Sequence, residues 1–130
     1  MNEQHEELAH AFLLKAQHDL FTARHTLAAS DSPTDTPCFH SQQAVEKALK
    51  ALLTFHKIVS PRTHDLLILL DIVLNLAPEL EKYREIFSVM TSYAVEIRYP
   101  DDWYEPERQE AEEALKIAEE VVEKIKDYCK

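Results

Sequence analysis

The chain contains no glycine, although average usage would place about nine in a sequence of this length. Glycine supplies the positive φ angles of tight turns and allows a backbone to approach a phosphate closely. Its absence excludes P-loops and dinucleotide-binding loops, and it argues against sheet-rich folds, whose hairpins and bulges need such residues. A helical domain can form without glycine, so the sequence predicts an all-α fold.

The length and charge of the chain narrow its class further. Its 130 residues suffice for one compact domain, 45% of them are hydrophobic, and the net charge is −10. This charge argues against nonspecific binding of nucleic acid but leaves room for a small local basic site. A charged N-terminus, no apolar run long enough for a membrane span, and two cysteines without a CxxC pair favour a cytoplasmic protein without a disulfide framework.

Apolar residues recur at steps of three and four in five segments, and each segment is predicted to be a helix. The predicted helices cover roughly residues 6–29, 37–57, 64–76, 78–97 and 107–128. Pro37 suits a first-turn position, and Thr63 can cap the third and shortest helix. Short loops between four long helices and one short helix predict an antiparallel up-and-down bundle forming a single domain over residues 1–130.

The seven histidines do not show the spacing of a metal site. No two of them are separated by three or four residues, and His5 and His10 are separated by five. A step of five places two side chains about 140° apart around a helix, so they cannot share a metal ion. The sequence therefore predicts surface histidines, with no metal and no cofactor.

The second predicted helix carries a polar row within its apolar pattern: His40, Gln42, Gln43, Glu46, Lys47 and Lys50. Positions 39, 43, 46 and 50 share one face of the helix, and positions 40, 43 and 47 share a neighbouring face. The row could be the solvent side of the helix. It could also be a set of hydrogen-bonding groups that faces a cleft or a symmetry mate.

Residues 94–104 combine an arginine, a proline, two adjacent aspartates and aromatic side chains. Arg98 offers a planar fork for phosphate, and Tyr99, Trp103 or Tyr104 offers a stacking face for a base. In the alternative interpretation, Arg98 offsets the dipole at a helix C-terminus, and Trp103 and Tyr104 cover the end of the bundle.

Three blocks of the sequence together resemble the HEPN domain. They are CFHSQQAVEKALKA (38–51), PRTHDL (61–66) and AVEIRYPD (94–101), in the order and spacing of that family. The resemblance covers nearly the whole chain. It implies an up-and-down bundle of four helices with a short extra helix, a homodimer with a cleft between protomers, and a minimal nucleotidyltransferase as partner, often in a toxin–antitoxin pair.

Many HEPN proteins are metal-independent ribonucleases, whose signature is an arginine followed after four to six residues by a histidine. Arg98 stands where that arginine belongs, but positions 103, 104 and 105 are Trp103, Tyr104 and Glu105, and no histidine follows His64. The signature is absent. The chain is thus similar to the nucleotide-binding version of the family, in which Arg98, Lys47 and the polar row would hold a phosphate-bearing ligand.

Three hypotheses follow from the sequence and the resemblance. The first is a homodimeric module that binds nucleotide or short RNA and pairs with a minimal nucleotidyltransferase; its predicted ligand-binding residues are His40, Gln43, Lys47, Arg98, Tyr99 and Asp101. The second is a ribonuclease toxin that uses Arg98 with a displaced histidine, His40 or His64. The third is an adaptor that binds no ligand.

Overall fold

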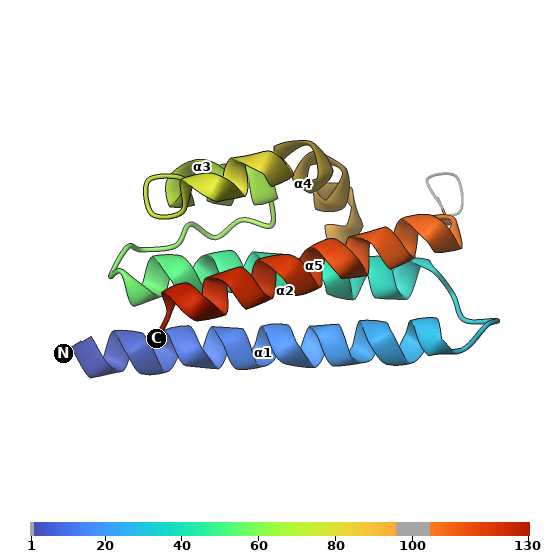
Figure 1. Ribbon diagram of the computed structural model, residues 1–130, viewed down its shortest axis with the longest axis horizontal. Helices are drawn as coiled ribbons and strands as arrows, with labels where there is room; N and C mark the ends of the chain where they lie inside the picture. Colours follow the sequence, from blue (N-terminus) through green and yellow to red (C-terminus); the bar gives the residue numbers. More distant parts are fainter. Residues whose placement is uncertain (1, 96–104) are drawn as a thin grey trace.

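Three long helices lie side by side along the molecule: α1 (Asn2–Ala28), α2 (Asp35–Phe55) and α5 (Arg108–Tyr128) (Figure 1). The computed structural model describes residues 2–95 and 105–130, and every element in these ranges is helical, which confirms the all-α prediction. A short turn after α1 reverses the chain, so α2 runs antiparallel to α1. The chain ends beside its beginning, where Nε2 of His10 lies 2.8 Å from the backbone oxygen of Cys129.

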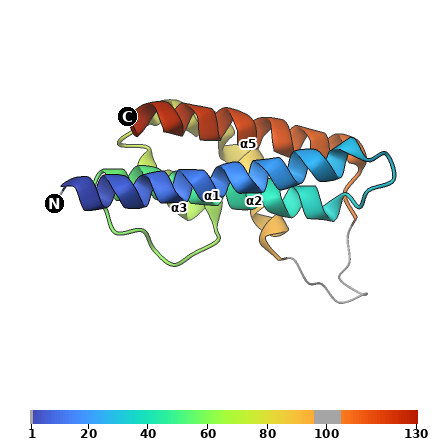
Figure 2. The ribbon, with the colours of Figure 1, turned by 90° about the horizontal axis from the view of Figure 1, so that it is seen from below.

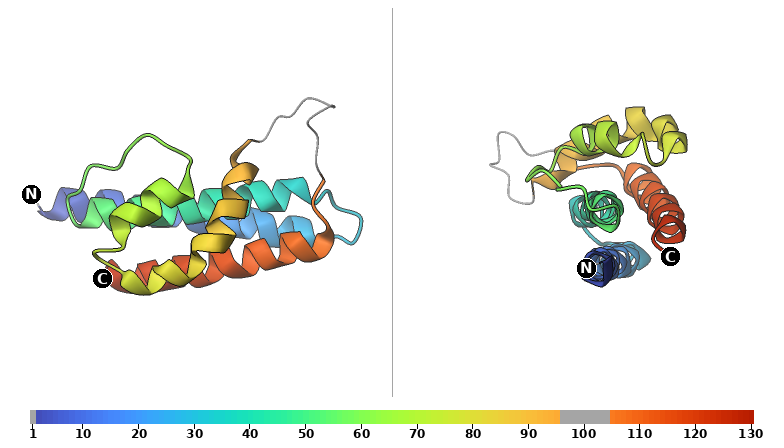
Figure 3. Two further views of the ribbon diagram at one scale, coloured as in Figure 1. Left: turned by 90° about the horizontal axis from the view of Figure 1, so that it is seen from above. Right: turned by 90° about the vertical axis from the view of Figure 1, so that its left-hand side faces the viewer.

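A second layer of shorter helices covers α2 and α5 (Figures 1 and 3). It consists of α3 (Leu66–Val73), the 3₁₀ helix η1 (Pro78–Tyr83), α4 (Arg84–Thr91) and the 3₁₀ turn η2 (Ser92–Ala94). The segment η1–α4–η2 takes the place of the fourth long helix, and α3 is the additional short one. The antiparallel up-and-down bundle predicted from the sequence is therefore confirmed.

The apolar stripes of the helices meet around α2, which packs against α1, α5, α3 and α4. Small side chains from α1 and α5, such as Ala16 and Ala118, are fully buried and let these helices approach α2 closely. Larger side chains fill the centre of the bundle, including Leu49, Leu70 and Phe87. Because α2 is surrounded on most of its circumference, its remaining polar residues are confined to a narrow strip.

The short helix α3 begins two residues later than predicted, and Thr63 is not its cap. Asp65 is the N-cap: its carboxylate accepts a hydrogen bond from the backbone N–H of Leu67 at 2.9 Å. The Thr63 hydroxyl instead accepts one from the N–H of Asp65 at 3.0 Å. Both side chains can cap a helix, and the one that directly precedes the buried leucine run is used.

The fourth predicted helix, 78–97, begins as the 3₁₀ helix η1 rather than as an α-helix. Its backbone N–H of Leu80 bonds to the carbonyl of Ala77, three residues earlier. Leu80 and Tyr83 are both buried. A 3₁₀ helix places residues i and i+3 directly above one another, so this geometry turns both side chains towards the core.

The two cysteines, Cys38 and Cys129, are buried and do not form a disulfide. Burial raises the pKa of the Cys38 thiol to about 12 and that of Cys129 to about 11. Both side chains are therefore uncharged hydrophobic groups at neutral pH. None of the helices in the described part of the chain has the length and apolar character needed to span a membrane.

We expect Leu49→Ala to destabilise the fold by about 2–5 kcal/mol, because Leu49 is fully buried at the centre of α2 and its truncation leaves a cavity. Leu14→Ala is the matched control: Leu14 is 56% exposed on α1, and its truncation should change stability by less than about 0.5 kcal/mol. Urea unfolding followed by circular dichroism measures both. Equal losses in the two variants would contradict the placement of α2 in the core.

Candidate functional site

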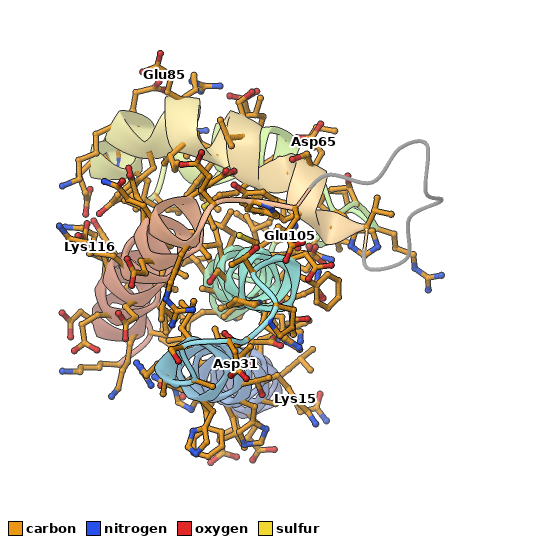
Figure 4. All side chains as sticks on the ribbon, turned by 90° about the vertical axis from the view of Figure 1, so that its right-hand side faces the viewer. Lys15, Asp31, Asp65, Glu85, Glu105 and Lys116 are labelled. Carbon is orange, nitrogen blue, oxygen red and sulfur yellow. The ribbon has the colours of Figure 1, made fainter. Side chains whose placement is uncertain are left out.

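One side of α2 is not covered by any helix in the described ranges. Viewed along the bundle, α1 lies below α2, α5 beside it, and α3 and α4 above it (Figure 3, right). The side of α2 that faces away from α5 is bordered by α1 and by the segment 56–65. In Figure 2 this segment and α5 lie on opposite sides of α1 and α2. Lys15 of α1 and Asp65 flank this side, whereas Lys116 of α5 lies on the other (Figure 4). We call it the open face of α2.

The polar row of the sequence lies along this face. Of the predicted ligand-binding residues, His40, Gln43 and Lys47 are there, and each is partly exposed. Arg98, Tyr99 and Asp101 lie outside the described residues, as do Trp103 and Tyr104.

The first anchor of the open face is Asp19 on α1, whose side chain is only 10% exposed. Its Oδ1 lies 2.8 Å from Nδ1 of His40, and its Oδ2 accepts a hydrogen bond from Nζ of Lys47 at 2.6 Å. His40 and Lys47 are two turns apart on the same side of α2. A single carboxylate from α1 therefore holds both side chains in place.

The second anchor is Glu46 on α2, whose side chain is 6% exposed. Its Oε2 accepts a hydrogen bond from Nζ of Lys50 at 2.9 Å, and its Oε1 lies 2.9 Å from Nδ1 of His64. Burial raises the pKa of this carboxyl, but the hydrogen bonds from Lys50, His64 and Gln42 outweigh burial and keep the pKa below its ordinary value. Glu46 is thus charged at neutral pH.

Two glutamines complete the site, one buried and one partly exposed. The amide of Gln42, which is fully buried, donates to the backbone carbonyl of His64 at 3.0 Å and ties the segment 56–65 to α2. Gln43 uses its Nε2 for hydrogen bonds to Gln42 Oε1 at 2.6 Å and to Glu46 at 3.5 Å. Its carbonyl oxygen accepts no hydrogen bond from another described residue, and such an oxygen suits a donor group better than a phosphate.

The two predicted faces of the helix thus correspond to two carboxylate-centred clusters. His40 and Lys47 belong to Asp19, and Lys50 with His64 belongs to Glu46. The interpretation of the row as a plain solvent side is wrong for Gln42 and Glu46, which are buried. His40, predicted to be a surface residue, is partly exposed: its side chain is 23% exposed and is held by Asp19.

The bonds to Asp19 and Glu46 determine what the two imidazoles offer. A carboxylate only accepts hydrogen bonds, so in each ring Nδ1 is the donor, and Nε2 makes no hydrogen bond to another described residue. In the neutral ring Nε2 carries a lone pair and can accept a proton; in the charged ring it is a hydrogen-bond donor. Each ammonium also keeps donor hydrogens beyond the one directed at its carboxylate.

The role of Asp19 was not predicted from the sequence. Asp19 lies within the apolar pattern of the first helix, which continues on either side of it with the buried residues Ala16, Leu20 and Ala23. A charged residue at such a position is rarely buried without a partner. A charged residue at an apolar position of the first helix was therefore the sign that Asp19 has a buried partner. The sequence could not identify His40 and Lys47 as the partners. Among the described residues, no group of three His, Cys, Asp or Glu side chains is placed to hold a metal ion.

Comparison with known proteins gives the family. The profile of the HEPN domain matches residues 9–128. A protein of Methanocaldococcus jannaschii named "Putative toxin MJ1304" is 32% identical in an alignment of length 143 that covers 94% of this chain and 88% of that protein. The chain belongs to the HEPN family.

Two solved structures share the fold. The crystal structure of TT1696 from Thermus thermophilus has a TM-score of 0.74 and 31% sequence identity, covering 92% of this chain and 96% of that one. The structure of ST0689, described as an archaeal HEPN homologue, has a TM-score of 0.73 and 26% identity, covering 94% and 98% of the two chains.

We expect Glu46→Gln to lower the free energy of unfolding by about 1–3 kcal/mol at pH 7, because Lys50 and His64 lose their shared carboxylate. The folded-state pKa of Glu46 is depressed, so its contribution is present above the ordinary glutamate pKa and is lost as the pH falls through the folded-state value. The difference between the two proteins should therefore shrink below about pH 4. Urea unfolding at several pH values measures it, with Glu123→Gln on the exposed side of α5 as control; a difference that grew on acidification would contradict the assignment.

Asp19→Asn should also destabilise the fold, by about 1–3 kcal/mol, because a neutral amide replaces the carboxylate that holds Lys47 and His40. Asp31→Asn makes the same chemical change at an exposed position after α1 and should be close to neutral. Thermal unfolding of the pair gives the comparison. A melting temperature for Asp19→Asn equal to that of Asp31→Asn would show that the cluster around Asp19 contributes nothing to folding.

Proposed function

We propose that this HEPN-family protein binds a nucleotide or a short single-stranded RNA segment on the open face of α2. In the proposal it acts as a homodimer, together with a minimal nucleotidyltransferase, in a toxin–antitoxin-type system. The observation that carries it is the pair of clusters on this face, where buried carboxylates hold His40, Lys47, Lys50 and His64. The M. jannaschii relative, named as a putative toxin, supports the toxin part of the proposal.

The geometry favours recognition of a phosphate with an attached sugar or base. Lys47 and Lys50 provide ammonium donors, and the rings of His40 and His64 provide Nε2. Gln43 provides a carbonyl oxygen for a ribose or base donor. The sequence adds Arg98 and Tyr99, which we propose to supply a bidentate phosphate contact and a stacking face.

The homodimer is proposed because the open face of α2 carries polar and charged side chains and no helix of the described residues covers it. A second protomer facing it would close the site into a cleft, as the family resemblance implies. Sedimentation equilibrium of the purified protein measures this association. We expect a dimer, and a monomer at micromolar concentration would contradict this part of the proposal.

Replacement of Lys47 tests the binding function directly. Lys47→Ala removes an ammonium group from the open face and should weaken binding of a fluorescent single-stranded RNA by roughly 10- to 100-fold, the worth of a charged hydrogen bond. Lys116→Ala removes a lysine on the opposite side of the bundle and should leave binding within about twofold. Fluorescence anisotropy at fixed salt measures both, since affinity for RNA depends on ionic strength. Equal effects would place the RNA elsewhere.

The bond between His40 and Asp19 favours one second candidate, the metal-independent endoribonuclease. With Nδ1 held by Asp19 at 2.8 Å, Nε2 of His40 would take the proton of a 2′-hydroxyl in this enzyme, and Arg98 would bind the scissile phosphate. Incubation of labelled single-stranded RNA in EDTA with wild type, His40→Ala and Arg98→Ala distinguishes this enzyme from a binding module. If the wild type cleaves the RNA and both variants do not, the protein is a ribonuclease. If the wild type leaves the RNA intact, the protein binds RNA without cleaving it.

A further inference from the structure

The open face of α2 is not a simple basic surface, because each of its two lysines already forms an ion pair with a carboxylate. Nζ of Lys47 lies 2.6 Å from Asp19, and Nζ of Lys50 lies 2.9 Å from Glu46. Two carboxylates therefore balance two ammonium groups. A phosphate approaching this face meets little net positive charge from the described residues while the histidines are neutral.

The carboxylates cannot readily move aside for an incoming anion. The side chains of Asp19 and Glu46 are only 10% and 6% exposed, so packed neighbours surround each carboxylate. Removing the lysine from either pair would leave each buried carboxylate with a histidine as the basic partner described for it, which is unfavourable. A ligand phosphate must therefore bind with both pairs intact.

We infer that this site takes up the phosphate group of a nucleotide or RNA together with protons, which are accepted by His40 and His64. The inference rests on the proposed binding function and adds the protonation state of the bound site. Each ring can gain a proton at Nε2 without breaking its Nδ1 bond to Asp19 or Glu46. Protonation thus adds positive charge and a new N–H donor without rearranging the cluster.

The groups around each ring fit this assignment. His40 faces Asp19 from α1 and has Lys47 beside it on α2, both bound to the same carboxylate. His64 faces Glu46, which also holds Lys50, and is followed in the chain by Asp65; Lys15 of α1 flanks the same side of α2. A bound phosphate adds negative charge beside the rings, and a nearby negative charge favours the protonated form of an imidazole.

Glu46 remains charged over the pH range in which histidines exchange protons. The hydrogen bonds to its carboxylate keep the pKa of Glu46 below the ordinary glutamate value, well under that range. The proton that accompanies the ligand is therefore carried by imidazole rather than by Glu46.

The test measures the affinity of the dinucleoside monophosphate UpU as a function of pH. Its phosphodiester does not titrate between about pH 5.5 and 8.5, so any pH dependence in that range arises from the protein. We expect the dissociation constant to rise with pH, by up to about tenfold per pH unit for each histidine that must be protonated. Calorimetry in two buffers of different ionisation enthalpy should show net proton uptake on binding.

Three histidine variants assign the protons. His40→Gln and His64→Gln should each reduce the pH dependence and the proton uptake, and the double variant should abolish both. His25→Gln is the control: His25 is exposed on α1, stacked on Phe21 at a ring distance of 4.3 Å, and its replacement should leave the pH dependence unchanged. Circular dichroism of each variant shows whether the fold is retained.

The outcomes separate this inference from the function on which it rests. Binding of UpU with no pH dependence would overturn the inference and leave the binding function standing. A pH dependence that survives in the folded double variant would assign the protons to other groups and also overturn it. Absence of UpU binding at every pH would contradict the proposed function itself.

Discussion

The structure depends on how α2 is surrounded. It packs against α1, α5, α3 and α4, and this burial leaves only one strip of its surface in contact with solvent among the described residues. Polar residues on such a helix must either lie on that strip or find partners inside. Gln42 and Glu46 take the second course, because both are buried and hydrogen-bonded. The constraint that stabilises the bundle therefore also concentrates its reactive and charged groups on one face.

The same interactions serve folding and the candidate site. Asp19 fixes His40 and Lys47 across the α1–α2 interface, and Glu46 with Gln42 fixes the segment that leads into α3. These bonds hold the side chains in defined positions before any ligand arrives, which lowers the entropic cost of binding. They also neutralise the lysines. The described site is thus held by its own ion pairs and close to charge-neutral, and we propose that its response to an anion depends on the imidazoles.

Much of the fold could be predicted because its signals are local. Apolar periodicity located the long helices to within a few residues, and the absence of glycine pointed to an all-α class. The predictions that were wrong concern places where two local structures are both possible, such as two capping residues or two kinds of helix. Asp65 rather than Thr63 caps α3, and residues 78–83 form a 3₁₀ helix because Leu80 and Tyr83 both turn towards the core. Such outcomes depend on the packing of the surrounding elements.

The sequence by itself determined the helical class and the polar row of α2, since these follow from residue type and from spacing along one helix. Only the tertiary structure decided which side of that row is buried and which carboxylate holds each cation. Asp19 and His40 are 21 residues apart, and His64 lies 18 residues beyond Glu46. Contacts between separate elements are set by how those elements pack, because the pattern within a single helix specifies its faces but not the partners that meet them.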